Sequence, residues 1–230
     1  MERIWEKYPD IAQRVRKSHE EAELHGGHDF VHAFRVGNIA QQIALKEWGT
    51  HLSQLAGIAG LCHNADRVIQ TNSGLKHGDV SQQEIRGLIR TWVGGYLDSR
   101  GLGIVADAIL RHDGKNSPDD SEVLIALMDA DRVVNLDADL FIRSGQHYHS
   151  LPAVDYRNLL DDPDATYRDP RSVLRDIEYS LDWIDQKSGV CVRTTSGLLM
   201  AKSRAKTFST FFEALQSQLA EEGILPWPFD

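Results

Sequence analysis

Long apolar runs and basic charge are both scarce in this sequence. The longest uninterrupted apolar run, Val123–Met128, has six residues and is followed by Asp129, whereas a membrane-spanning helix needs about 20. The chain carries 25 Lys and Arg against 34 Asp and Glu, a formal net charge of −9. Because proteins that wrap nucleic acid need a basic surface, we expect neither a membrane nor nucleic acid as a partner. A small anionic substrate needs only a few local cations and remains compatible with this charge.

Cysteine is also scarce. Cys62 and Cys191 are the only two cysteines, and they form no CxxC pair, so neither a disulfide framework nor a zinc finger is predicted. The N-terminal residues 1–10 are charged and contain no apolar signal core. We therefore expect a cytoplasmic protein with reduced thiols.

Strand-type alternation of apolar and polar residues is nearly absent, and helical spacing takes its place. The C-terminal region repeats apolar residues at i, i+3, i+4, i+7 and i+11, namely Phe208, Phe211, Phe212, Leu215 and Leu219. Thr194 to Ser196 offer caps for this helix and Gly223 suits its end. Residues 52–69 and 121–136 are apolar on most sides, which is typical of central, buried helices. The sequence predicts an all-α, single-domain helical bundle over residues 1–230.

One stretch of about residues 143–170 lacks helical spacing and holds three prolines and the acidic run DDPD. Irregular segments of this length are usually functional, disordered or inserted. We interpret it as an insertion that covers a pocket, with a contact in a homodimer as the alternative.

Polar residues interrupt the predicted central helices at three places. His63, Asn64, Asp66 and Arg67 lie within the apolar segment 52–69, where unsatisfied polar groups are costly. Taken alone, His63 is best explained as a core histidine bonded to a backbone carbonyl. The four polar residues together favour a polar cavity.

The second interruption is Asp129–Arg132 in the segment 121–136. A buried pair of Asp129 with Arg132, at i and i+3, explains those two residues but leaves Asp131 on another face. The third is His32, which continues the apolar stripe of a helix that begins near Asp29. One divalent ion would satisfy His32, His63 and Asp131 together, and nitrogen and oxygen ligands suit Mn, Fe, Zn, Ni or Mg.

These segments resemble a known family. His32–Val36 (HAFRV), His63–Asn64 and Asp129–Arg132 (DADR) are similar to the H…HD…D signature of the HD-domain superfamily of metal-dependent phosphohydrolases, and residues 194–222 resemble the last helix of bacterial uncharacterised HD hydrolases. The resemblance covers about residues 20–222. It implies an all-helical fold with ions held between helices and, for most members, hydrolysis of nucleotide phosphate esters.

The resemblance assigns His32 and His63 to the two signature histidines and Asp131 to the closing aspartate. Position 64 departs from the signature, because Asn64 stands where the family has Asp. An amide oxygen can still bind a metal, so Asn64 is kept as a fourth ligand, but it cannot bridge two ions. Asp66, at i+3 from His63, is our hypothesis for a replacement carboxylate.

Residues near the predicted ion complete the candidate site. His112 resembles a family histidine that faces the substrate or a second ion, although a helix C-terminal histidine that favours the dipole explains it too. Lys115 and Asn116 follow on the same segment, and Arg67 is a further cation. We expect His112, Arg67, Lys115 and Asn116 to bind substrate, and Asp131, His112, Arg67 and Lys115 to serve catalysis. Arg35 is a further candidate cation for the phosphate, although the resemblance implies that it braces helices instead.

The sequence thus predicts hydrolysis of a nucleotide or other small phosphate ester by a metal-activated water. A catalytically silent HD protein that binds a nucleotide or metabolite is one alternative, favoured by Asn64. A di-iron oxygenase on the same fold is another, with His77 and His112 as extra ligands. His28, near the start of the helix that carries His32, is explained equally well by helix capping and by a role in the site. The other histidines, His19, His25, His51, His147 and His149, are expected at the surface, although the last two can reach the site from the irregular stretch.

Overall fold

The chain folds into helices joined by short connections, apart from one long irregular segment. The computed structural model describes residues 3–76 and 78–229, and these contain no β-strand. The α-helices are α1 (Ile4–Lys7), α2 (Pro9–Glu21), α3 (Phe30–Trp48), α4 (Thr50–Cys62), α5 (Ala65–Ser73), α6 (Gln82–Val93), α7 (Ser99–Arg111), α8 (Glu122–Val134), α9 (Leu140–His147), α10 (Val173–Tyr179) and α11 (Thr195–Glu221). The predicted all-α class is confirmed.

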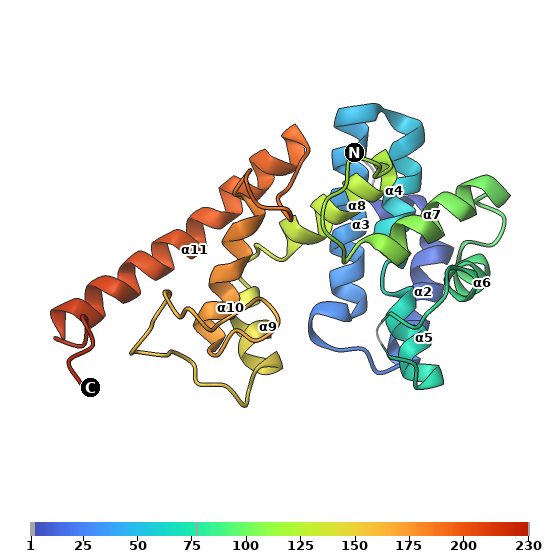
Figure 1. Cartoon of the computed structure of the whole chain (residues 1–230). Coiled ribbons are helices and arrows are strands. Elements are labelled where there is room, and N and C mark those ends of the chain that lie inside the picture. The colour runs from blue at the N-terminus through green and yellow to red at the C-terminus, as the bar shows by residue number, and fades with distance from the viewer. Residues whose placement is uncertain (1–2, 77, 230) are drawn as a thin grey trace.

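Helices α3, α4 and α8 form the centre of the fold (Figure 1). Helices α3 and α4 approach closely because glycines face each other. A Cβ atom added at Gly60 would lie 2.8 Å from both the Cα and the N of Gly37. This contact leaves no room for a side chain between the two backbones, and it brings the polar residues of both helices near each other.

The predicted segment 52–69 is not one helix. It divides into α4 and α5. His63 is the C-cap residue of α4, and Asn64 is the N-cap residue of α5. The amide nitrogen of Asn64 donates a 2.9 Å hydrogen bond to the carbonyl oxygen of His28. The chain therefore breaks its helix at His63 and Asn64. The break lets the buried amide of Asn64 reach a hydrogen-bond partner.

Three helices begin with a side-chain cap, and the cap of α11 lies in the stretch 194–196 where the sequence predicts it. The carboxylate of Asp29 accepts from the backbone nitrogen of His32 at 2.8 Å at the start of α3. Ser121 caps α8 and Thr194 caps α11 in the same way. These caps fix where α3 and α8 begin, and hence which of their faces turn toward α4.

The apolar core has two clusters. One is built mainly from α2 to α8, and the second from α10, α11 and the residues after α8. Ile39 and Met200 pack against both clusters, which is consistent with the single domain that the sequence predicts. In the second cluster Phe208 is buried, but Phe211 is 40% exposed and packs on Phe141, so it lies at the edge of the predicted apolar face.

The irregular segment starts later than predicted. Residues 140–147 form α9, and the stretch without α-helix runs from 148 to 172. It lies beside α9 and α10, on the side of the molecule away from α6 and α7 (Figure 1). Pro152, Pro163 and Pro170 all fall within it, and proline disfavours helix because it lacks a backbone N–H and its ring clashes with the preceding turn.

Asp129 and Arg35 hold elements together. The buried carboxylate of Asp129 accepts hydrogen bonds from the backbone nitrogens of Arg193 and Thr194, the latter at 2.7 Å, whereas Arg132 lies 4.0 Å away. Asp129 therefore anchors the start of α11 more closely than it pairs with Arg132. Arg35 binds Asp137 and, at 2.7 Å, Asp139, so it links α3 to the residues between α8 and α9.

His19 is buried, which makes its predicted surface position wrong. Its exposed fraction is 2%, and its ring packs edge-on against Trp92. Burial lowers the pKa of His19 from 6.5 to about 4. Helix α2 contributes this residue from the same side as Val15 and Ile11, a stripe that its apolar spacing indicated.

None of the described helices is both long and apolar enough to cross a membrane.

Gly60→Ala tests the close contact of α3 and α4. The new methyl group would strike backbone atoms of Gly37, so we expect a loss of about 1–3 kcal/mol in the free energy of unfolding. Gly87→Ala is the matched control, because its Cβ meets nothing within 4 Å and alanine favours helix by roughly 0.5–1 kcal/mol. Urea unfolding measures both. Equal stability of the two variants would contradict the packing described.

His19→Leu tests the burial of the imidazole. The unfolded chain binds a proton below pH 6.5 and the folded chain only near pH 4, so His19 lowers wild-type stability as pH falls between these values. From pH 7.5 to 4.5 the wild type should lose about 2–3 kcal/mol more than His19→Leu. The exposed His51, replaced by Leu, is the control. Parallel stability curves for wild type and His19→Leu would refute the burial.

Candidate metal centre

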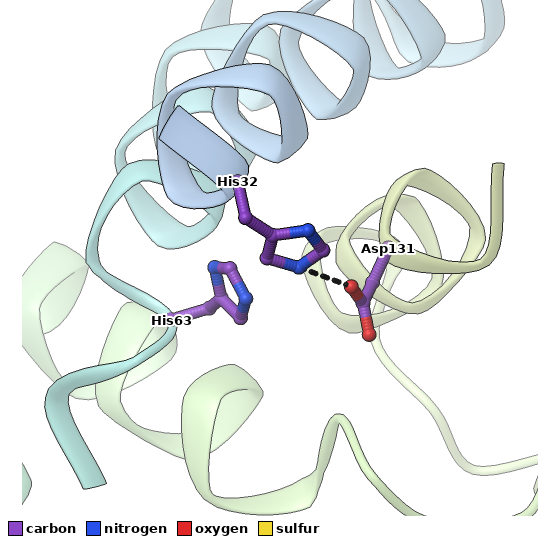
Figure 2. A group of neighbouring side chains, drawn as sticks. All are labelled: His32, His63 and Asp131. Carbon is purple, nitrogen blue, oxygen red and sulfur yellow. Dashed lines mark hydrogen bonds and ion pairs between the residues drawn. The ribbon is translucent and has the colours of Figure 1, made fainter. Parts of the chain in front are cut away.

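Three of the predicted ligands come together from three helices. His32 belongs to α3, His63 ends α4 and Asp131 belongs to α8 (Figure 2). Each offers one ligand atom, and the three atoms lie within 4.8 Å of one another. The Nε2 of His32 lies 2.9 Å from Oδ1 of Asp131. Imidazole nitrogens and a carboxylate oxygen in this arrangement are a donor set that suits a divalent transition metal.

His63 presents its ring in the form that binds metals. Its Nδ1 lies 2.7 Å from the carbonyl oxygen of Gly60, and because a carbonyl only accepts, Nδ1 carries the proton and Nε2 keeps its lone pair. Burial lowers the pKa of His63 well below 6.5, so the ring is neutral at pH 7. Its centroid lies 5.2 Å from that of His32.

Asp131 is ionised. Burial alone would raise the pKa of its carboxyl group, but the hydrogen bond from His32 and the nearby imidazoles outweigh burial and hold the pKa well below the ordinary value. Asn135, one turn further along α8, donates from Nδ2 to Oδ1 of Asp131 at 3.2 Å. The carboxylate is thus charged and oriented for a cation.

Two further candidate ligands, Asn64 and Asp66, follow His63 and differ in their contacts. Asn64 uses its amide nitrogen to bind His28, so only its oxygen is suited to a metal ion. Asp66 accepts from Gln70 at 3.3 Å through Oδ2, while its buried Oδ1 has no hydrogen-bond partner among the described residues. Burial raises the pKa of Asp66. Asp66 does not join the ligand group of His32 and His63.

His112 lies next to this group, as its predicted role requires. It caps the end of α7, its Nδ1 donates to the carbonyl of Ile109 at 2.6 Å, and its ring centroid is 5.3 Å from that of His63. Burial lowers the pKa of His112, but the negative charges of Asp113 and Asp131 outweigh it and the pKa is raised. A favourable interaction with the dipole of α7 explains why a histidine stands at its C-terminus. It does not explain why Asp113 and Asp131 lie beside that histidine.

Asp113 was missed in the sequence. Its Oδ1 lies 3.1 Å from Nε2 of His112, and Arg67 donates to its Oδ2 at 3.0 Å. His112, Asp113 and Asp131 form a second group whose ligand atoms lie within 4.8 Å of one another. The signal in the sequence is a carboxylate directly after a candidate ligand histidine.

The predicted substrate-binding residues divide into two kinds. Arg67 faces Asp113 and Asp66 and therefore lies beside the second group. Asn116, by contrast, donates to the carbonyl of Cys191 at 2.8 Å and accepts from Arg132 at 2.7 Å, so both ends of its amide are engaged in contacts within the protein. Lys115 is exposed and has no ion-pair partner among residues 3–76 and 78–229. His77 lies outside the described residues.

A cavity of about 670 Å³ lies beside the candidate metal centre. Its lining includes Arg143, Tyr148, Tyr167 and Trp183 together with His28 and His147. The cavity does not contain the three ligand residues, but Asn135 connects them to it, since Asn135 lines the cavity, accepts from Arg143 at 3.2 Å and donates to Asp131. The irregular segment borders the cavity through Tyr148 and Tyr167.

A solved structure has a similar fold. It belongs to a protein of an uncultured Thermotogales bacterium described as a predicted HD superfamily hydrolase, with a TM-score of 0.56 and 23% identity over 93% of this chain and 91% of that one. No protein-family model and no curated protein matches the chain. At this level of identity the likeness concerns the fold. The chain therefore has an all-α fold of the HD-domain type, as its sequence predicts.

Proposed function

We propose that this protein is a metal-dependent phosphohydrolase that acts on a nucleotide or another small phosphate ester. The observation that carries the proposal is the convergence of His32, His63 and Asp131 within 4.8 Å, although they lie on three different helices. A likeness in fold to a protein described as a predicted hydrolase agrees with it. The donor set suits Mn, Fe, Zn or Ni better than Mg, because two of its atoms are imidazole nitrogens.

A divalent ion at this position supplies a water of lowered pKa, near 7 in favourable sites, and polarises a phosphoryl oxygen. The protein itself fixes the protonation and the orientation of the proposed ligand side chains. Gly60 fixes the tautomer of His63, and Asn135 orients Asp131 through its amide. Arg67 adds a permanent positive charge beside Asp113, which stabilises negative charge on phosphate oxygens.

The cavity beside the centre is the proposed substrate site. Its aromatic residues Tyr148, Tyr167 and Trp183 offer flat surfaces for an organic group, whereas Arg143 and His147 add groups that attract phosphate. Asn135 lines the cavity and donates to Asp131, so the proposed binding site for the phosphate is the side of the cavity that Asn135 lines. Lys115, exposed on the segment after His112, remains a proposed phosphate contact.

A silent binding protein is the second candidate, and Asn64 favours it. An amide at position 64 carries no charge, whereas the aspartate of the family signature carries one negative charge. A divalent ion therefore binds more weakly beside Asn64. Such a protein would bind a nucleotide in the same cavity without hydrolysing it. Turnover of a phosphate ester therefore distinguishes the two functions, and metal content alone does not.

His32→Ala should remove both the metal and the activity. Loss of one of three protein ligands weakens Mn²⁺ binding by at least about 100-fold, which elemental analysis and Mn²⁺ titration of tag-free protein measure. Hydrolysis of a panel of nucleotides and sugar phosphates with added Mn²⁺ should fall to background. The exposed His51, replaced by Ala, should leave both unchanged. Equal metal content in His32→Ala and wild type would sink the proposal, and turnover of no ester by wild type would favour the silent protein.

Asn64→Asp should strengthen the dependence on metal. Without an ion, the new carboxylate faces the carbonyl oxygen of His28 that now accepts from the amide, and we expect a loss of about 1–3 kcal/mol in the free energy of unfolding. With an ion, the added negative charge tightens binding. The rise in melting temperature on adding Mn²⁺ should thus be larger than in wild type. An unchanged rise would show that position 64 does not face the ion.

A further inference from the structure

Two neighbouring helices supply much of the wall of the cavity beside the candidate metal centre. Helices α9 and α10 pack against each other (Figure 1). Arg143 and His147 of α9 line the cavity and are four residues apart, as are Asp176 of α10 and Ser180, which begins the 3₁₀ turn Ser180–Trp183 after it. Residues at this spacing share one face of a helix. The cavity therefore has a basic side chain on one helix and an acidic one on the other.

Asp176 places a carboxylate with one unused oxygen in this wall. The side chain is half-buried, and its Oδ2 accepts a 2.6 Å hydrogen bond from the hydroxyl of Ser144. Among residues 3–76 and 78–229, no Arg or Lys forms an ion pair with Asp176, and its Oδ1 accepts no hydrogen bond. Burial raises the pKa of Asp176, and neither Ser144 nor the nearby His147 offsets this effect. Because partly buried carboxylate oxygens are stabilised by donors, Oδ1 is an acceptor suited to a ligand.

Ser180 is a second polar group without a partner in the same wall. It is only 3% exposed, it lines the cavity, and its hydroxyl makes no hydrogen bond within the part of the chain that the structure describes. Buried hydroxyl groups are normally hydrogen-bonded. A serine hydroxyl both donates and accepts, so Ser180 adds a contact of either kind one helical turn after Asp176.

Arg143 gives the cavity its opposite charge. Its Nη1 and Nη2 each lie 3.2 Å from Oδ1 of Asn135, whose Nδ2 donates to Asp131. A phosphate is attracted by this guanidinium and repelled by the carboxylate of Asp176. The two charges therefore favour a ligand that is anionic at one end and carries neutral hydrogen-bond donors at the other.

We propose that Asp176 and Ser180 bind two neighbouring hydroxyl groups of the organic phosphate that occupies the cavity, so that its organic part is a sugar, the ribose in the case of a nucleotide. This inference names the substrate class of the proposed function, on which it rests. One hydroxyl donates to Oδ1 of Asp176, and the other exchanges a hydrogen bond with Ser180, as groups that both donate and accept can do. Ser144 is a positioning residue that holds Asp176 through Oδ2, and Arg143 attracts the phosphate.

The test is equilibrium binding of nucleosides to the full chain in the presence of Mn²⁺, measured by titration calorimetry. Adenosine and uridine are each compared with the dideoxyribose counterpart, which lacks both sugar hydroxyls. A nucleoside has no phosphate ester, so hydrolysis does not disturb the titration. Wild type should bind each ribose form at least about tenfold more tightly than its counterpart, because a hydrogen bond to a charged group contributes on that order.

Two variants remove the proposed contacts separately. Asp176→Asn keeps the shape of the side chain but not its charge, and Ser180→Ala removes the hydroxyl. Each should reduce the preference for the ribose form to about threefold or less. Asp182→Asn, an exposed acid of the turn after α10, should keep the wild-type preference. Circular dichroism checks that each variant is folded.

The comparison of the two sugar forms in wild type decides the matter even if a variant fails to fold. Equal binding of both forms, a preference that survives in both variants, or no binding of any nucleoside would overturn the inference. Hydrolysis of ribose and dideoxyribose phosphate esters with equal kcat/KM would also overturn it, yet leave the proposed function standing. Selective binding of the ribose forms without turnover of any ester would support the inference and contradict the proposed hydrolysis.

Discussion

Placing charged and polar side chains inside a tightly packed apolar bundle is the constraint on which this structure depends. The glycine contact between α3 and α4 draws the helices together, and α8 packs on both. His32, His63 and Asp131 are thereby forced toward each other in a region with little water. Such groups are costly to bury alone, and each becomes tolerable only through the others or through a cation.

Local sequence signals were sufficient for much of this architecture. Capping residues such as Asp29, Ser121 and Thr194 mark helix starts because they act within one turn. His32, His63 and Asp131 were recognisable because each breaks an apolar pattern, and a polar residue at a core position needs a partner. The sequence therefore indicated the three side chains that the structure brings together.

Other features depend on contacts distant in sequence and were not predictable from local pattern. The turn at His63 and Asn64 requires the carbonyl of His28, 36 residues earlier. The sequence alone suggests that Asn116 binds substrate, but in the fold its amide donates to Cys191 and accepts from Arg132. Asp113 carried a weak signal, since an exposed acid next to a histidine is common, and only its approach to Asp131 makes it notable.

The central claim is that a metal ion occupies the space between α3, α4 and α8. Crystals of tag-free protein grown with Mn²⁺, with diffraction recorded to give an anomalous difference map, test it most directly. The account predicts a strong anomalous peak within coordination distance of His32, His63 and Asp131. A map without a peak there, or with manganese only at surface carboxylates, would contradict it.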